Sequence, residues 1–188
     1  MTVVSKQPAG LYVASSYNED AFQQFNATVF EYGIDTREQF DGWEVLMDAI
    51  KLSLDADPTL NLSSFYEKLQ LAQEKKNDIV EIMTQALAYK ANWESHLAVA
   101  EMYVRKLKSE LSQLAEVRVL KNKELQEALM YSKRPDVLDC HAYCKAIFNW
   151  VETMIKVFDK KLDLIDSANL NINRQINVTE LLTYKGLL

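Results

Sequence analysis

Apolar side chains recur with a seven-residue period through two long stretches of this 188-residue chain. In the first stretch, alternating steps of four and three residues from Phe65 to Leu114 meet apolar side chains at thirteen of fifteen positions. In the second, from Val137 to Ile176, the same spacing meets them at ten of twelve positions. A repeat held this long is typical of a coiled-coil seam, because it keeps one stripe facing a partner helix.

The rare glycine and proline residues predict where these helices end. The chain has only 4 Gly and 3 Pro, and none of them lies between Thr59 and Arg134. Pro135 disfavours helical geometry in the residue before it, so the first helix should end there and a second should begin at once. Helices joined by so short a turn are normally antiparallel neighbours. We therefore expect an all-α fold built on a long antiparallel helical hairpin, or coiled coil, with arms at 63–131 and 136–176.

Two shorter amphipathic segments precede the hairpin. A capping box formed by Ser16 and Glu19 opens the first segment, and Gly33 is expected to end it. A second capping box that begins at Thr36 opens the other segment. The sequence therefore predicts a small N-terminal head of two short helices.

The chain accordingly divides into three predicted parts. Residues 1–62 form the head, with a flexible arm at its start, 63–176 form the hairpin, and 177–188 form a C-terminal tail. The head carries 3 basic and 10 acidic side chains, whereas residues 101–134 carry 8 basic and 5 acidic ones, in a chain of net charge −6. An acidic head is thus followed by a locally basic hairpin tip.

Residues suited to catalysis or metal binding are few. Asp139, Cys140, His141 and Cys144 form the one cluster that resembles a metal site, but a structural zinc ion needs four ligands. If the hairpin folds at its predicted turn, His96 lies far from this cluster. No nucleophile with a histidine base and no glycine-rich phosphate loop is evident. We expect no enzyme activity, no metal and no cofactor, and we expect both cysteines to pack in the core.

The predicted arms differ in length by more than twenty residues, so part of the first apolar stripe has no partner within the hairpin. Narrow seams of this kind commonly drive self-association. We therefore expect a homo-oligomer. The residues expected in its contacts are Phe65, Leu69, Ala72, Ile79, Met83 and Trp93.

Basic side chains near the hairpin tip could follow a phosphate backbone, with Tyr103 and Tyr131 stacking on the bases of a single strand. The candidate nucleic-acid-binding residues are Arg105, Lys106, Lys108, Arg118, Lys121, Lys123, Lys133 and Arg134. A charged outer face is also the ordinary condition of a coiled coil, so a solvated surface is the alternative interpretation. A ring of subunits would favour nucleic-acid binding, because it would join several such patches into one positive surface.

Four segments stand out together: Ala88–Trp93, Val104–Lys108, the return helix Phe148–Ile165, and Ser167–Ile172. In this order they resemble the UvsY-type recombination mediators of tailed phages, over residues 64–178. The resemblance implies an oligomeric helical barrel that binds single-stranded DNA. It also implies contacts with a RecA-type recombinase, which the barrel helps to load in place of single-strand binding protein, without catalysis.

The leading hypothesis is therefore a non-enzymatic oligomeric mediator with single-stranded DNA and a recombinase or single-strand binding protein as partners. The alternative is a structural or assembly protein, such as a phage scaffold, tail or connector component, that acts only through protein–protein contacts. A membrane-remodelling module fits less well, because no lone basic amphipathic helix is present. No apolar run approaches the roughly 18 residues that span a bilayer, and no signal peptide is evident. We expect a cytoplasmic protein, in the host cytoplasm if it is a phage protein, with no membrane partner.

Overall fold

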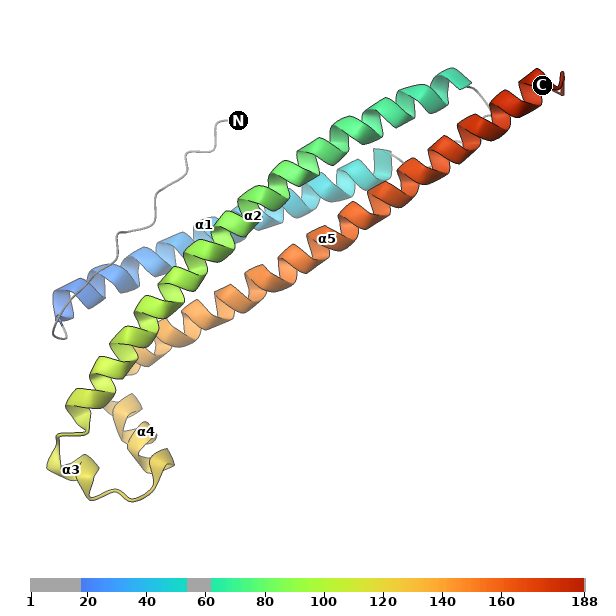
Figure 1. Ribbon diagram of the computed structural model, residues 1–188. Coiled ribbons are helices and arrows are strands. Elements are labelled where there is room, and N and C mark those ends of the chain that lie inside the picture. The colour runs from blue at the N-terminus through green and yellow to red at the C-terminus, as the bar shows by residue number, and fades with distance from the viewer. Residues whose placement is uncertain (1–17, 54–61, 188) are drawn as a thin grey trace. The chain divides into compact units, whose positions relative to one another are not determined.

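The computed structural model describes residues 18–53 and 62–187, and every secondary-structure element within them is a helix. The helices are α1 (Glu19–Ser53), α2 (Leu62–Leu111), α3 (Ala115–Arg118), α4 (Lys123–Lys133) and α5 (Pro135–Tyr184). Figure 1 shows the three long helices, with α3 and α4 beyond the end of α2. The all-α prediction is confirmed, and the long helices α2 and α5 pack antiparallel.

The chain forms two compact units, and each long helix contributes to both. Unit 1 comprises Met1–Thr36 and Tyr89–Val151, whereas unit 2 comprises Arg37–Ala88 and Glu152–Leu188. Unit 1 also contains α3 and α4. Within each unit, segments of α1, α2 and α5 pack as three helices, not as the two of a simple hairpin.

Burial along α2 confirms the predicted seven-residue stripe. Its seven principal positions, every seventh residue from Phe65 to Leu107, are all buried. A second stripe, which the sequence analysis did not identify, lies three residues further along each heptad. Its members are Ile82, Tyr89, His96 and Tyr103, of which Tyr89 is half-buried and the others are buried. In unit 1 this stripe contacts α1, where the rings of Tyr103 and Phe22 lie 5.2 Å apart.

Helix α1 is continuous over 35 residues, so the predicted two-helix head is wrong. It begins after Asn18, whose Oδ1 accepts a hydrogen bond of 3.2 Å from a first-turn backbone N–H. The predicted cap, Ser16, lies outside the described residues. Gly33 does not end the helix, because a mid-helix glycine costs only about 1 kcal/mol relative to alanine and buried side chains continue on both sides. Thr36, predicted as a cap, is buried inside the helix and donates to the Tyr32 carbonyl at 2.6 Å.

The predicted first arm, 63–131, is not one helix, because α2 ends at Leu111. The next positions of its stripe are Leu114, which is 38% exposed, and then the exposed Arg118 and Lys121. Without buried apolar side chains to continue the stripe, packing no longer supports the helix, although the segment contains neither glycine nor proline.

The predicted helix boundary before Pro135 is confirmed, but the chain reverses earlier than expected. In unit 1, Lys90 Nζ lies 5.8 Å from the centre of the Phe148 ring, and in unit 2, Lys76 Nζ lies 2.7 Å from Asp166 Oδ1. The midpoint between Lys90 and Phe148 and the midpoint between Lys76 and Asp166 both fall close to Leu120. The chain therefore reverses between α3 and α4. These two lysines occupy stripe positions, and their charged contacts across to α5 select one register for the two helices.

Helix α5 continues to Tyr184, so much of the predicted tail, 177–188, is helical. Both α2 and α5 have 50 residues, and the predicted difference in arm length is therefore wrong. The start of α2 is covered in unit 2, where Phe65 packs with Ile172 and Ile176. The Tyr66 hydroxyl donates to Glu180 at 2.6 Å nearby.

A glycine C-cap closes α5. Gly186 has a φ of 66°, in the left-handed region that favours glycine. Its N–H donates to the Thr183 carbonyl at 3.0 Å, and the Leu187 N–H donates to the Leu182 carbonyl at 2.9 Å. This pair of bonds is the Schellman motif, which satisfies the last free carbonyls of a helix.

The two glycines of α1 provide a matched test of its packing. A Cβ added at Gly33 would collide with the Tyr143 side chain, whereas one added at Gly42 meets nothing within 4 Å. We predict that Gly33→Ala lowers the free energy of unfolding by about 1–3 kcal/mol through overpacking. Gly42→Ala should raise it by about 0.5–1 kcal/mol, because alanine is the better helix former. Urea unfolding followed by circular dichroism measures both, and equal stabilisation by the two variants would contradict the predicted clash.

Candidate interaction surfaces

All eight candidate nucleic-acid-binding residues belong to unit 1, but half of them already face carboxylates. The pairs are Arg105 with Glu101 at 3.1 Å, Lys108 with Glu127 at 3.7 Å, Lys133 with Glu116, and Arg134 with Glu19 at 2.7 Å and Asp136 at 2.9 Å. Lys106 is half-buried. The positive charge of the predicted basic patch is thus largely balanced by carboxylates of the same unit.

Arg134 has a structural role in this unit. Its guanidinium bridges Glu19 on α1 and Asp136 on α5, and lies 5.7 Å from the centre of the Phe22 ring. The hydrogen bond from Arg134 lowers the pKa of Asp136 below its usual value. Arg134 therefore links the start of α1 to the start of α5. Its side chain is only 24% exposed, so little of it is accessible to a ligand.

The remaining three candidates lie close together along the chain, since Arg118 ends α3, Lys121 lies between the two helices and Lys123 begins α4. We call Arg118–Lys123 the basic loop, because its six residues include three basic and no acidic side chains. Arg118 Nε donates to the Ser112 carbonyl at 3.3 Å, which is a neutral partner. Arg118 forms no ion pair with the described residues, so its charge is not neutralised. Lys121 and Lys123 are exposed and form no ion pair with the residues that the structure describes. Val119, between the basic side chains, is 78% exposed.

Several contacts hold the basic loop in place. Gln126 Nε2 donates to the Leu120 carbonyl at 2.6 Å, and Asn122 Oδ1 accepts from the Glu124 N–H at 2.8 Å, which caps α4. Val117, just before the loop, is buried. The loop therefore presents cations and one apolar side chain from an anchored position.

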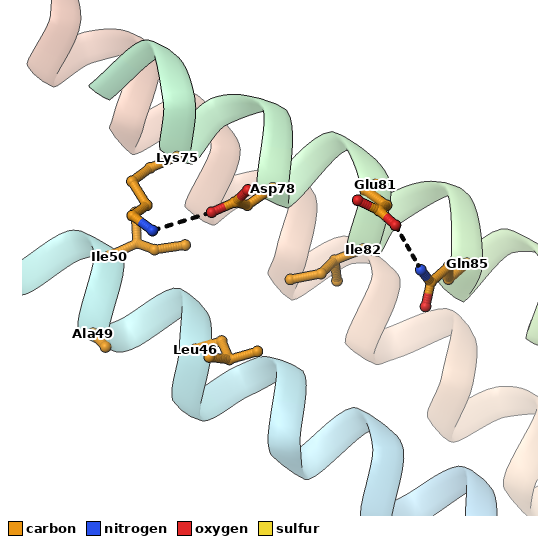
Figure 2. Close-up of a pocket in the computed structure, with 8 residues that line it drawn as sticks. All are labelled: Leu46, Ala49, Ile50, Lys75, Asp78, Glu81, Ile82 and Gln85. Carbon is orange, nitrogen blue, oxygen red and sulfur yellow. Dashed lines mark hydrogen bonds and ion pairs between the residues drawn. The ribbon is translucent and has the colours of Figure 1, made fainter. Parts of the chain in front are cut away.

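Unit 2 has a groove of about 380 Å³ between α1 and α2 (Figure 2). Its α1 wall consists of Leu46, Ala49 and Ile50, and its α2 wall includes Ile82 among polar side chains. Leu46 is 55% exposed, so apolar surface at this groove remains open to solvent. An open apolar hollow with a polar rim is typical of a contact surface.

The α2 rim of the groove carries two carboxylates, Asp78 and Glu81, and one lysine, Lys75. Asp78 pairs with Lys75 at 3.2 Å, and Glu81 accepts from Gln85 Nε2 at 3.3 Å (Figure 2). The other amide atom, Gln85 Oε1, is buried and has no hydrogen-bond partner among the described residues. The α1 and α2 segments of this unit, 37–53 and 62–88, carry five basic and eight acidic side chains. The groove thus favours an apolar group accompanied by cations or other donors.

The six residues predicted to mediate oligomerisation pack within the chain itself. Phe65, Ala72, Ile79 and Trp93 are buried, while Leu69 and Met83 are half-buried. Leu69 packs against the cluster that Phe65 forms with α5 in unit 2. Helix α5 thus packs against the start of the stripe that was predicted to lack a partner within the chain.

The cysteine and histidine cluster is a packing feature of unit 1. The chain reverses near Leu120, so the argument that His96 lies far from His141 was wrong. Even so, no group of three or more His, Cys, Asp or Glu residues suited to a metal occurs within residues 18–53 and 62–187. Cys140 and Cys144 are buried free thiols, and their mutual hydrogen bond together with burial raises the pKa of Cys144. A thiol held in its protonated form is a poor nucleophile.

Sequence reasoning missed a partly buried polar cluster in unit 1. Trp93 Nε1 donates to Thr36 Oγ1 at 3.1 Å, and Asn92 Nδ2 donates to the Tyr32 hydroxyl at 3.0 Å. Burial raises the pKa of Tyr32 to about 12. His96 packs against this cluster, with its ring 5.3 Å from that of Tyr32. The seven-residue spacing of Tyr89, His96 and Tyr103 was the available signal, and it marks a second packing stripe of α2.

Comparisons of the chain with protein-family models, curated proteins and solved structures find no match. The resemblance to UvsY-type mediators stays a prediction. Between residues 18 and 187, none of the described helices has an apolar stretch long enough to cross a bilayer.

His96 makes the stability of the protein depend on pH. Burial lowers the pKa of His96 below 6.5, so the unfolded chain binds this proton more readily than the folded one. The associated stability is present above pH 6.5 and is lost as the pH falls towards the folded pKa, by at most about 1.4 kcal/mol per pH unit. We predict that His96→Phe removes this loss, whereas Asp136→Asn, which breaks the ion pair with Arg134, lowers stability at neutral pH and loses this effect only as the pH falls below the usual carboxyl pKa of 3.8. Unfolding free energies measured from pH 8 to pH 3 would show whether the two effects separate.

Proposed function

We propose that this chain acts without catalysis as a self-assembling helical protein, through contacts between copies. The observation that carries the proposal is the open groove of unit 2, where Leu46 and Ala49 of α1 face a rim on α2 that holds two carboxylates and one lysine. Neighbouring Val45 is 70% exposed and extends the apolar surface on α1. Burying such surface against a second chain is favourable, at about 25 cal/mol per Å² of apolar area removed from water.

Unit 1 offers a surface of the opposite character. The basic loop exposes Val119 among three cations, whereas the groove combines exposed Leu46 with Asp78 and Glu81. Complementary charge of this kind selects a partner and accelerates association. Because one copy carries both surfaces, a second copy of this chain is the partner that the chemistry favours.

The proposal predicts a concentration-dependent mass in solution. Sedimentation equilibrium over a wide range of protein concentration should show the average mass rising above the 21.6 kDa of one chain. Added salt should weaken the association, because the proposed contacts include charged groups. A mass of one chain at every concentration, even at low salt, would overturn the proposed function.

Binding of single-stranded nucleic acid is a second candidate function, favoured by one observation. Arg118, Lys121 and Lys123 keep uncompensated charge on one anchored loop. The other five candidate residues contribute less, since four of them face carboxylates and Lys106 is half-buried. The wider mediator role, with loading of a recombinase, rests on the resemblance to the UvsY-type family.

The second candidate predicts salt-dependent DNA binding centred on the loop. With a labelled single-stranded oligonucleotide, the logarithm of the affinity should fall linearly with the logarithm of salt, with a slope of about −0.7 per phosphate contacted. Lys121→Glu with Lys123→Glu should reduce binding by about tenfold or more, whereas Arg105→Glu, at a residue already paired with Glu101, should change it less. Absence of binding at low salt would remove this candidate.

A further inference from the structure

We infer that the basic loop of one copy binds in the unit 2 groove of another copy, with Val119 seated against Leu46 and Ala49. The inference rests on the proposed self-association and names the two surfaces that meet. It assigns the groove an occupant, and it gives the loop a protein partner in place of nucleic acid.

The apolar part of the fit depends on size and exposure. Val119 is 78% exposed, more than any other large apolar side chain described except Tyr184. The groove holds about 380 Å³, enough for a few side chains but not for a long helix. A short loop with one projecting valine suits such a space. Its anchored backbone also lowers the entropic cost of binding, because little conformational freedom is left to lose.

The polar part of the fit depends on charge and hydrogen bonding. Arg118, Lys121 and Lys123 supply three cations around the valine, and the groove rim supplies Glu81 and Asp78, of which Asp78 already pairs with Lys75 at 3.2 Å. Asp78 and Glu81 are both exposed, so an arriving cation can reach them.

Gln85 adds an independent reason to expect a donor in the groove. Its Oε1 atom is buried without a hydrogen-bond partner among the described residues. Figure 2 shows this oxygen pointing away from Glu81, which the amide nitrogen contacts. A lysine or arginine donor from the loop would satisfy it, and an unsatisfied buried acceptor is otherwise costly.

The proposed contact joins two different surfaces, the loop of one copy and the groove of another. If two copies exchange loop and groove reciprocally, both contacts are filled in a twofold dimer. Without reciprocal exchange, each copy keeps one loop and one groove free, and the assembly closes as a ring or extends as a filament.

A charge-reversal pair tests the inference. The loop variant carries Lys121→Glu and Lys123→Glu, and the groove variant carries Asp78→Lys and Glu81→Lys. All four positions are exposed, so folding should persist, and circular dichroism checks this. In sedimentation experiments each variant alone should self-associate about tenfold or more weakly than the unchanged chain. An equimolar mixture should recover association, because each altered loop then meets an altered groove and each unchanged loop an unchanged groove.

Matched controls separate this contact from general charge effects. Lys156→Glu with Lys160→Glu makes the same change in net charge at exposed positions of α5 and should leave association within about twofold of the unchanged chain. Val119→Ser should weaken association about tenfold, whereas Val178→Ser, at a valine of α5 that is 54% exposed, should not.

The possible outcomes are distinct. If the unchanged chain associates but both charge variants associate equally well, the loop-and-groove contact is overturned and the proposed function stands. If the unchanged chain never associates, the proposed function itself is overturned. If the loop variant loses binding to single-stranded DNA but keeps its full self-association, the loop serves nucleic acid and the inference is overturned.

Discussion

The structure depends on α2 burying two apolar stripes at once. One stripe, represented by Ala72 and Trp93, repeats every seven residues, and the other contains His96 and Tyr103. A helix with one stripe is satisfied by one partner, but two stripes require two. Helices α1 and α5 fill these places, and the polar cluster around Thr36 forms where α1 meets Trp93 of the first stripe and His96 of the second in unit 1.

The heptad pattern predicted α2 and α5 well, because stripe periodicity reports directly on which residues become buried. It failed where the outcome depended on a distant neighbour. Gly33 was read as a helix end, although its place in the structure is opposite Tyr143, which leaves no room for a side chain. The end of α2 after Leu111 carries no glycine or proline signal, since it reflects the loss of apolar partners further along the stripe.

The same limit applies to the two surfaces. The sequence identified all the basic residues, but it could not show that Glu19 neutralises Arg134 from a position more than a hundred residues away. The groove was missed because Leu46 and Ile82 come from separate helices, and neither is unusual in its own segment. Only the unbalanced charge of the basic loop, with three cations in six residues, can be recognised from the sequence alone.

The way the three long helices supply both units affects how the protein can be dissected. Each unit combines separate stretches of the chain, with Tyr89–Val151 joined to the N-terminal stretch in one and Arg37–Ala88 joined to the C-terminal stretch in the other. No single cut in the polypeptide therefore releases an intact unit. A truncated gene product would lack a wall of at least one bundle, and activity lost on truncation would report incomplete folding as readily as removal of a binding surface.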